Sequence, residues 1–162
     1  EINKIISFVS SFFLTMKREW SGIDRYRLDK FYMLFDCLTL SFFRILAHYI
    51  NKEEFPRLIS LIFKHDSEKI SLDYLPQALV LHFIENFWKY FRPSFISITD
   101  ENNRCVFFEH CVEGLCFLLY CGPSNYSKYA FESLTNLPAS IKIASFLVIF
   151  YRSIAETSHI NY

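Results

Sequence analysis

The stretch WSGIDRYRLDKFYML, residues 20–34, decides how this chain folds. It opens with a break at Ser21-Gly22, and Asp24 then stands where a helix N-cap is expected. Its carboxylate can accept hydrogen bonds from the free N–H groups of a first turn and favours the positive end of a helix dipole. Behind it an apolar stripe, spaced by three and four residues, continues for about seven turns until Asn51. The stripe consists of Leu28, Phe31, Phe35, Leu38, Phe42, Ile45, Leu46 and Tyr49. The pattern predicts one long amphipathic helix.

Charge is concentrated at the beginning of this helix. Five basic residues lie among three acidic ones; the basic residues are Lys17, Arg18, Arg25, Arg27 and Lys30. In one interpretation they contact RNA phosphates or an acidic partner. In the other they belong to a structural corner, where Arg25 pairs with Asp29 at i,i+4. Trp20 would then pack back on Tyr26 or Leu28. The two interpretations are compatible, and both stay open.

The rest of the chain predicts further helices separated by short breaks. We expect them at residues 2–18, from 52 or 53 to 64, from 71 or 73 to 92, at 104–120, at 127–134 and from 137 to about 155. Pro56 and Pro76 fall in first turns, where a missing N–H costs nothing. The pair Arg92-Pro93 is expected to end its helix. Residues 94–103 would form a connector in which Ile96 and Ile98 make a short extended piece.

These elements predict an all-α fold of six or seven helices in antiparallel succession. Only 3 Gly and 5 Pro interrupt 162 residues, too few for an all-β fold with its frequent turns. Stacked helix pairs, as in a HEAT-like α-solenoid bundle, would bury the apolar faces. We therefore expect a single helical domain over residues 1–162, and a fragment of a longer chain. No segment predicts a transmembrane span, since the apolar run at 141–151 is short and carries Lys142.

The charge balance limits the possible partners. Lys plus Arg and Asp plus Glu number 17 each, whereas proteins that clamp bare nucleic acid usually have a basic surplus. Any RNA contact must therefore be local, and we expect neither a membrane nor DNA as a partner. Apolar residues make up 52% of the chain. This excess leaves two alternatives open, an apolar surface covered by a partner or an ordinary core rich in Phe, Ile and Tyr.

Residues typical of catalytic and metal sites do not form recognisable patterns. The five cysteines, Cys37, Cys105, Cys111, Cys116 and Cys121, lack paired CxxC spacing and predict buried reduced thiols. The five histidines are scattered, and the chain has no HExxH, GxSxG, P-loop or GxGxxG motif. His82, on a Phe-rich helix, is interpreted as a hydrogen-bonded core or interface residue. We expect no enzyme, no catalytic residue, no metal and no cofactor.

The run at residues 20–34 resembles the signature of the ribosomal RNA-processing protein 1 family, in which a similar Trp–Gly–Asp–Arg–Arg–Leu–Asp–Lys–Phe pattern leads into a long helix. The matching positions are Trp20, Gly22, Asp24, Arg25, Arg27, Leu28, Asp29, Lys30, Phe31 and Met33. A weaker likeness covers residues 75–79 together with His82 and Glu85. Beyond Arg92 the likeness is one of helical pattern only.

The resemblance implies a nucleolar factor bound to precursors of the large ribosomal subunit, required for pre-rRNA processing and without a known catalytic centre. Its partners would be other assembly proteins and, locally, pre-rRNA. Contacts are expected at Lys17, Arg18, Arg25, Arg27 and Lys30, and a structural role at Trp20, Gly22, Asp24, Leu28, Asp29 and Phe31. Within residues 1–162 we expect neither the family's Trp-rich opening helix, which would lie before Glu1, nor its basic tail, and Phe35 and Asp36 occupy positions that are often basic. These departures favour protein contacts. The alternative is a generic helical-repeat adaptor outside the ribosome pathway.

Overall fold

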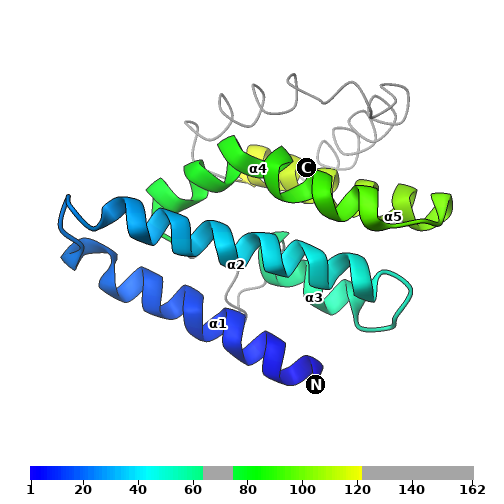
Figure 1. Cartoon of the computed structure of the whole chain (residues 1–162), viewed down its shortest axis with the longest axis horizontal. Helices are drawn as coiled ribbons and strands as arrows, with labels where there is room; N and C mark the ends of the chain where they lie inside the picture. Colours follow the sequence, from blue (N-terminus) through cyan, green and yellow to red (C-terminus); the bar gives the residue numbers. More distant parts are fainter. Residues whose placement is uncertain (64–74, 122–162) are drawn as a thin grey trace, which may run out of the picture.

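A computed structural model describes residues 1–63 and 75–121 of the chain, with side chains as far as residue 116. In these ranges the regular structure consists of five α-helices and one 3-10 turn (Figure 1). They are α1 (Ile2–Glu19), η1 (Trp20–Gly22), α2 (Leu28–Tyr49), α3 (Phe55–Phe63), α4 (Gln77–Ser97) and α5 (Glu101–Cys121). The predicted all-α class is confirmed. The helices predicted at 127–134 and from 137 onwards, and the loop at 65–71, lie outside the described residues.

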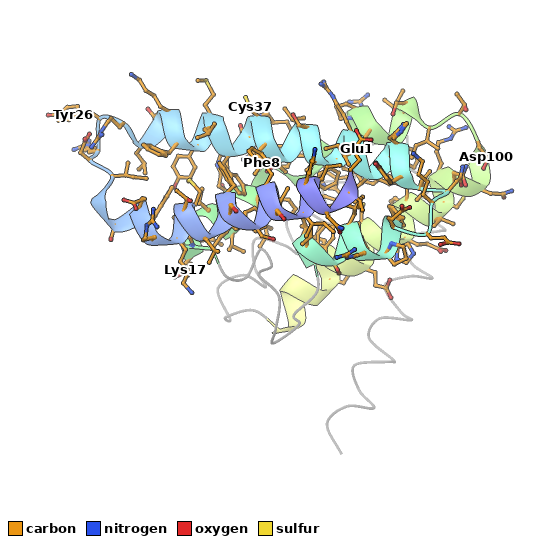
Figure 2. The ribbon with its side chains drawn as sticks, turned by 90° about the horizontal axis from the view of Figure 1, so that it is seen from below. Glu1, Phe8, Lys17, Tyr26, Cys37 and Asp100 are labelled. Atoms are coloured by element: carbon orange, nitrogen blue, oxygen red, sulfur yellow. The ribbon has the colours of Figure 1, made fainter. Side chains whose placement is uncertain are left out.

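The helices form two layers. One layer contains α1, α3 and α5, in which α3 contacts both others, and the other layer contains α2 packed against α4. Tyr32 contacts His82 and Phe43 contacts Phe87, so α2 and α4 run in the same direction. Seen from below, α2 lies above α1 and α3 (Figure 2). This arrangement is compatible with the stacked helix pairs that the sequence predicts.

Aromatic rings fill the space between the layers. Phe43 of α2 meets Phe87 of α4 at 6.0 Å and Phe107 of α5 at 6.4 Å, both edge to face. Phe91 stacks on Phe107 with a centroid distance of 5.4 Å. Such pairs stabilise a fold by about 0.5–1.5 kcal/mol beyond the burial of their area. The periodic phenylalanines therefore join three helices into one core.

Gly114 of α5 lies against the ring of Phe63 of α3. A Cβ atom at this position would lie 2.1 Å from the ring of Phe63, far inside van der Waals contact. Glycine in a helix interior costs about 0.5–1 kcal/mol relative to alanine. Here it is required because the ring of Phe63 occupies the space that any side chain would take.

The predicted end of α4 is wrong. The helix continues through Pro93 to Ser97, although a proline inside a helix costs about 3 kcal/mol or more. The turn after the proline is held by packing, since Phe95 stacks on Phe91 at 5.2 Å and contacts Phe108 at 6.4 Å. Of the predicted connector, Ile96 is helical, and only Ile98 has extended backbone.

Two helix starts also differ from the prediction. α5 begins at Glu101, three residues before the predicted start at residue 104, because the side chain of Asp100 accepts a hydrogen bond of 2.8 Å from the N–H of Asn103. Pro76 is the N-cap of α4 and lies just outside the helix. α3 agrees with expectation, since it begins at Phe55 with Pro56 in its first turn.

Within the described residues, α2 is the one helix long and apolar enough to cross a membrane by length and composition. Core helices of globular proteins have the same properties. Phe35, Thr39, Phe42, Phe43 and Leu46 of α2 are buried inside this fold. Packing against α3 and α4 covers these residues, whereas Met33 and Leu34 of the same helix are exposed.

Candidate functional site

The charged corner, residues 17–30, links α1 to α2 through η1 and a tight turn. The carboxylate of Asp24 accepts hydrogen bonds from the backbone N–H of Tyr26 at 2.9 Å and of Arg27 at 3.1 Å. It also pairs with Arg27 Nε at 2.5 Å. The hydrogen bond from Arg27 is the main reason that the pKa of Asp24 lies below its usual value. Asp24 therefore closes the turn that precedes α2.

The prediction that Asp24 is the N-cap of α2 is consequently wrong. The helix begins at Leu28, and Arg27 occupies the N-cap position without a side-chain capping bond. The carboxylate does accept from two backbone N–H groups, as expected, but these belong to an isolated turn. The spacing of Asp24 from the apolar stripe fits both arrangements, and only the backbone path distinguishes them.

Trp20 packs on a different residue from those predicted. Its ring meets Tyr32 edge to face at 5.5 Å and 71°, whereas Tyr26 is 93% exposed. Figure 2 shows Tyr26 at the extreme end of the molecule. The turn at 24–27 directs Tyr26 outwards, so the indole contacts a ring that lies further along α2. The corner is thus attached to α2 by an aromatic contact.

All five basic residues of the corner are exposed. Arg18 pairs with Glu19 and Arg27 with Asp24, each at 2.5 Å. The predicted ion pair between Arg25 and Asp29 is not formed among the described side chains. Exposed ion pairs usually contribute about 0–1 kcal/mol to stability. These charges lie together at one end of the molecule, and none of the five side chains is buried in the core.

The remaining residues of the motif at residues 20–34 differ in how far their side chains are buried. Leu28 and Phe31 are half-buried, and Phe31 packs against the core, whereas Asp29 is exposed. A side chain at Gly22 would meet nothing within 4 Å, and its backbone has no positive φ. Gly22 is therefore not required by close packing. Among these residues, Trp20 and Phe31 hold the corner on the core.

A second cluster lies between α2 and α4; we call it the Asp36 seam, consisting of Asp36, His82, Lys89 and Tyr90. Asp36 Oδ1 lies 2.7 Å from His82 Nε2 and accepts a hydrogen bond from the hydroxyl of Tyr90. Lys89 Nζ lies 2.6 Å from Asp36 Oδ2. In the sequence, Asp36 stood out only as a departure from the family pattern. The signal that could have revealed the seam was the carboxylate of Asp36 beside the apolar Phe35. A carboxylate buried in a core requires hydrogen-bond partners.

The seam holds its carboxylate ionised. Burial opposes the charge, but hydrogen bonds from Lys89, Tyr90 and His82 outweigh it and lower the pKa of Asp36. Burial and the bond to Asp36 raise the pKa of Tyr90. The ring of Tyr32 contacts that of His82 in a tilted arrangement at 4.6 Å, so a continuous chain of contacts leads from Trp20 to Asp36. His82 was expected to be a hydrogen-bonded core or interface residue; its hydrogen bond is confirmed, and its side chain is half-buried between α2 and α4.

The cysteines follow the prediction only in part. Cys111 and Cys116 are buried, and burial raises the pKa of both thiols, that of Cys116 to about 11. Cys37 and Cys105 are exposed, contrary to expectation. Cys105 shares a helix face with Cys116, but it lies near the start of α5, where that face extends past the core. The described residues contain no group of three side chains placed to bind a metal.

Comparison with known proteins gives consistent matches. A family model described as "Nucleolar protein, Nop52" matches residues 1–158. Ribosomal RNA processing protein 1 homolog A of Homo sapiens is 37% identical over 84 residues, which are 49% of this chain and 17% of that protein. Homolog A of Mus musculus is 38% identical over 82 residues, 49% of this chain and 16% of that protein.

Homolog B of Homo sapiens is 51% identical over 39 residues, 24% of this chain and 5% of that protein. The chain thus spans less than a fifth of the length of these relatives. No solved structure matches. The match over residues 1–158 confirms the resemblance carried by residues 20–34.

Proposed function

The chain belongs to the Nop52 family of nucleolar proteins, and on this basis we propose that it acts as a non-catalytic scaffold in ribosome biogenesis. In this proposal it binds precursor particles of the large subunit and supports pre-rRNA processing. Its partners are other assembly proteins, with pre-rRNA contacted locally. The similarity to ribosomal RNA processing protein 1 homologs supports the pathway.

The exposed charged corner is the observation that carries the scaffold part of the proposal. Its basic groups lie on the last turn of α1, on the turn that Asp24 closes and on the start of α2, and Trp20 attaches the corner to Tyr32. A contact surface held by a rigid support loses little conformational freedom when a partner binds. Such a corner can bind phosphate groups or acidic side chains without any catalytic step.

Co-purification tests the proposal. The tagged full-length protein is expected to bring down large-subunit rRNA precursors and their assembly proteins. Reversing the charge of the corner with Arg25→Glu and Lys30→Glu is expected to weaken this association, while the free energy of unfolding stays near that of the wild type. The matched control is Lys4→Glu with Arg92→Glu, two exposed positions outside the corner. Absence of precursor rRNA from the wild-type preparation would refute the pathway. Equal losses in both double variants would refute the role of the corner.

A further inference from the structure

A polar recess lies at the end of α2 opposite the charged corner. It has a volume of about 360 Å³ and is formed by the last turns of α2, the end of α4 and the loop leading into α5. Its lining residues are Arg44, Ala47, His48, Ile50, Asn51, Ser97, Ile98, Thr99, Asp100 and Asn103. Figure 2 shows Asp100 at the far end of the molecule from Tyr26. We call this feature the Asp100 recess.

One wall of the recess carries cationic and planar groups. Arg44 and His48 lie one turn apart on α2, and both are exposed. Lys52 Nζ lies 3.1 Å from His48 Nε2 and adds positive charge beside that ring. Guanidinium and imidazole planes can stack on nucleobases, and a guanidinium can donate two hydrogen bonds to one phosphate. This wall suits an anionic ligand that has a flat ring.

The loop before α5 and the start of α5 bring both donors and acceptors to the recess. Thr99, Asp100 and Asn103 line it, and their side chains carry a hydroxyl, a carboxylate and a carboxamide. Asp100 accepts a hydrogen bond from the N–H of Asn103 at 2.8 Å, which orients its carboxylate at the start of α5. Together with Asn51 across the recess, these groups can read the edge of a base, which carries donors as well as acceptors.

Unsatisfied polar atoms adjoin the same loop. Within the described ranges, two buried side-chain atoms lack a hydrogen-bond partner, Ser94 Oγ and Arg104 Nε. Ser94 precedes the loop and Arg104 follows it, and Arg104 Nη2 donates to the Thr99 carbonyl oxygen at 3.4 Å. Neither Ser94 nor Arg104 lines the recess itself. The Arg104 guanidinium also adds a positive charge next to the recess.

We propose that the Asp100 recess binds one nucleotide of a single-stranded RNA, with the phosphate on Arg44 and the base edge on Asn51, Asp100 and Asn103. The inference rests on the proposed function, because it specifies where pre-rRNA is contacted. The volume lies at the lower end of the range of about 300–1,000 Å³ that is typical of ligand pockets, which suits one nucleotide. The carboxylate side chains of an acidic peptide offer acceptors alone, whereas the edge of a base can also donate a hydrogen bond to the Asp100 carboxylate. RNA is therefore favoured over an acidic protein.

Fluorescence anisotropy of the full chain with a short labelled single-stranded RNA tests the proposal. We expect Arg44→Gln and Asn103→Ala each to raise the Kd about tenfold. Arg44→Gln should also lower the slope of log Kd against log salt by about one, because one phosphate contact is lost. The matched control is Arg92→Gln, which removes the same charge from an exposed position outside the recess. It should change the Kd by less than about twofold.

Three results would overturn the proposal: no RNA binding by the wild-type chain, equal weakening by Arg44→Gln and Arg92→Gln, or stronger competition by poly-glutamate than by unlabelled RNA. The last would show that the recess binds a protein carboxylate. Asn103→Ala removes no charge, so its effect separates a base contact from general electrostatic attraction. If the Arg44→Gln variant no longer binds the RNA but still co-purifies with precursor particles, the recess proposal is supported and the scaffold function stands. If the wild type co-purifies with particles yet binds no RNA, only the recess proposal fails.

Discussion

Two aspartates of this chain gather basic partners in different surroundings. Asp24 pairs with Arg27 at the charged corner, where the carboxylate is 47% exposed. Asp36 pairs with His82 and Lys89 in the seam between α2 and α4, where it is 16% exposed. Their partners lower the pKa of both, but only the partners of Asp36 must offset a substantial cost of burial. The same kind of pairing therefore supports the fold in the seam and leaves charge available to partners at the corner.

The largest effect is expected for Asp36→Ala. It leaves the hydroxyl of Tyr90 and His82 without their acceptor between two packed helices, so the free energy of unfolding should fall by about 2–3 kcal/mol. Urea denaturation followed by circular dichroism measures this loss. Asp29→Ala, on the exposed face of α2, is the matched control and should leave stability nearly unchanged. Equal effects at the two positions would show that the seam does not hold α2 to α4.

Acid titration tests how much stability the ionised carboxylate of Asp36 contributes. The pKa of Asp36 in the folded chain lies below the reference value of 3.8, so its ionised form stabilises the fold above that value. This contribution is lost as pH falls through the folded pKa. The gap in stability between the wild type and Asp36→Asn should therefore stay constant near neutral pH and close below about pH 4. Urea midpoints across acidic pH check the sign, and a gap that widens in acid contradicts it.

An intermediate effect is expected for Trp20→Ala, which detaches the corner from Tyr32. Trp20 is half-buried, and removing its ring contact should lower the free energy of unfolding by about 1–2 kcal/mol. Hydrogen exchange should become faster at residues 20–27 and change little in α4. Tyr26→Ala is the control, because that ring is 93% exposed. Unchanged exchange at the corner in Trp20→Ala would show that another contact holds it.

The smallest effect is expected for Asp24→Asn. The carboxamide oxygen can still accept from the N–H groups of Tyr26 and Arg27, and only the exposed ion pair is lost. Salt screens such pairs, so any change in thermal midpoint should be slight and should vanish at high ionic strength. Calorimetry at two salt concentrations measures this. A loss comparable with that of Asp36→Ala would contradict the distinction between corner and seam.

The sequence predicts the helices well where apolar spacing is regular. The stripe from Leu28 to Tyr49 became α2, and Pro56 lies in the first turn of α3 as expected, whereas Pro76 lies just before α4. The predicted end of α4 at Pro93 is wrong. The stacking of Phe95 on Phe91 joins residues in adjacent turns, and the helix therefore continues past the proline. The helix propensity of individual residues does not predict such packing between side chains.

The candidate site is predicted less completely. The basic residues of the corner are evident from composition, and their exposure agrees with a contact surface. The partner of Trp20 and the seam around Asp36 are not evident, since Asp36 bonds with residues more than forty positions away. The Asp100 recess likewise joins the end of α2 to a loop after α4. Contacts over such separations depend on how the two layers stack.

Residue spacing and composition, which are local properties, predicted the helical class, the long second helix and the place where basic charge gathers. The resemblance of residues 20–34 indicated the family. Only the tertiary structure decided that Asp24 closes a turn, that Trp20 meets Tyr32, that α4 passes through Pro93, and that Asp36 is buried among donors. The physical reason is that burial and partner choice are set by packing between helices, which depends on the whole chain at once.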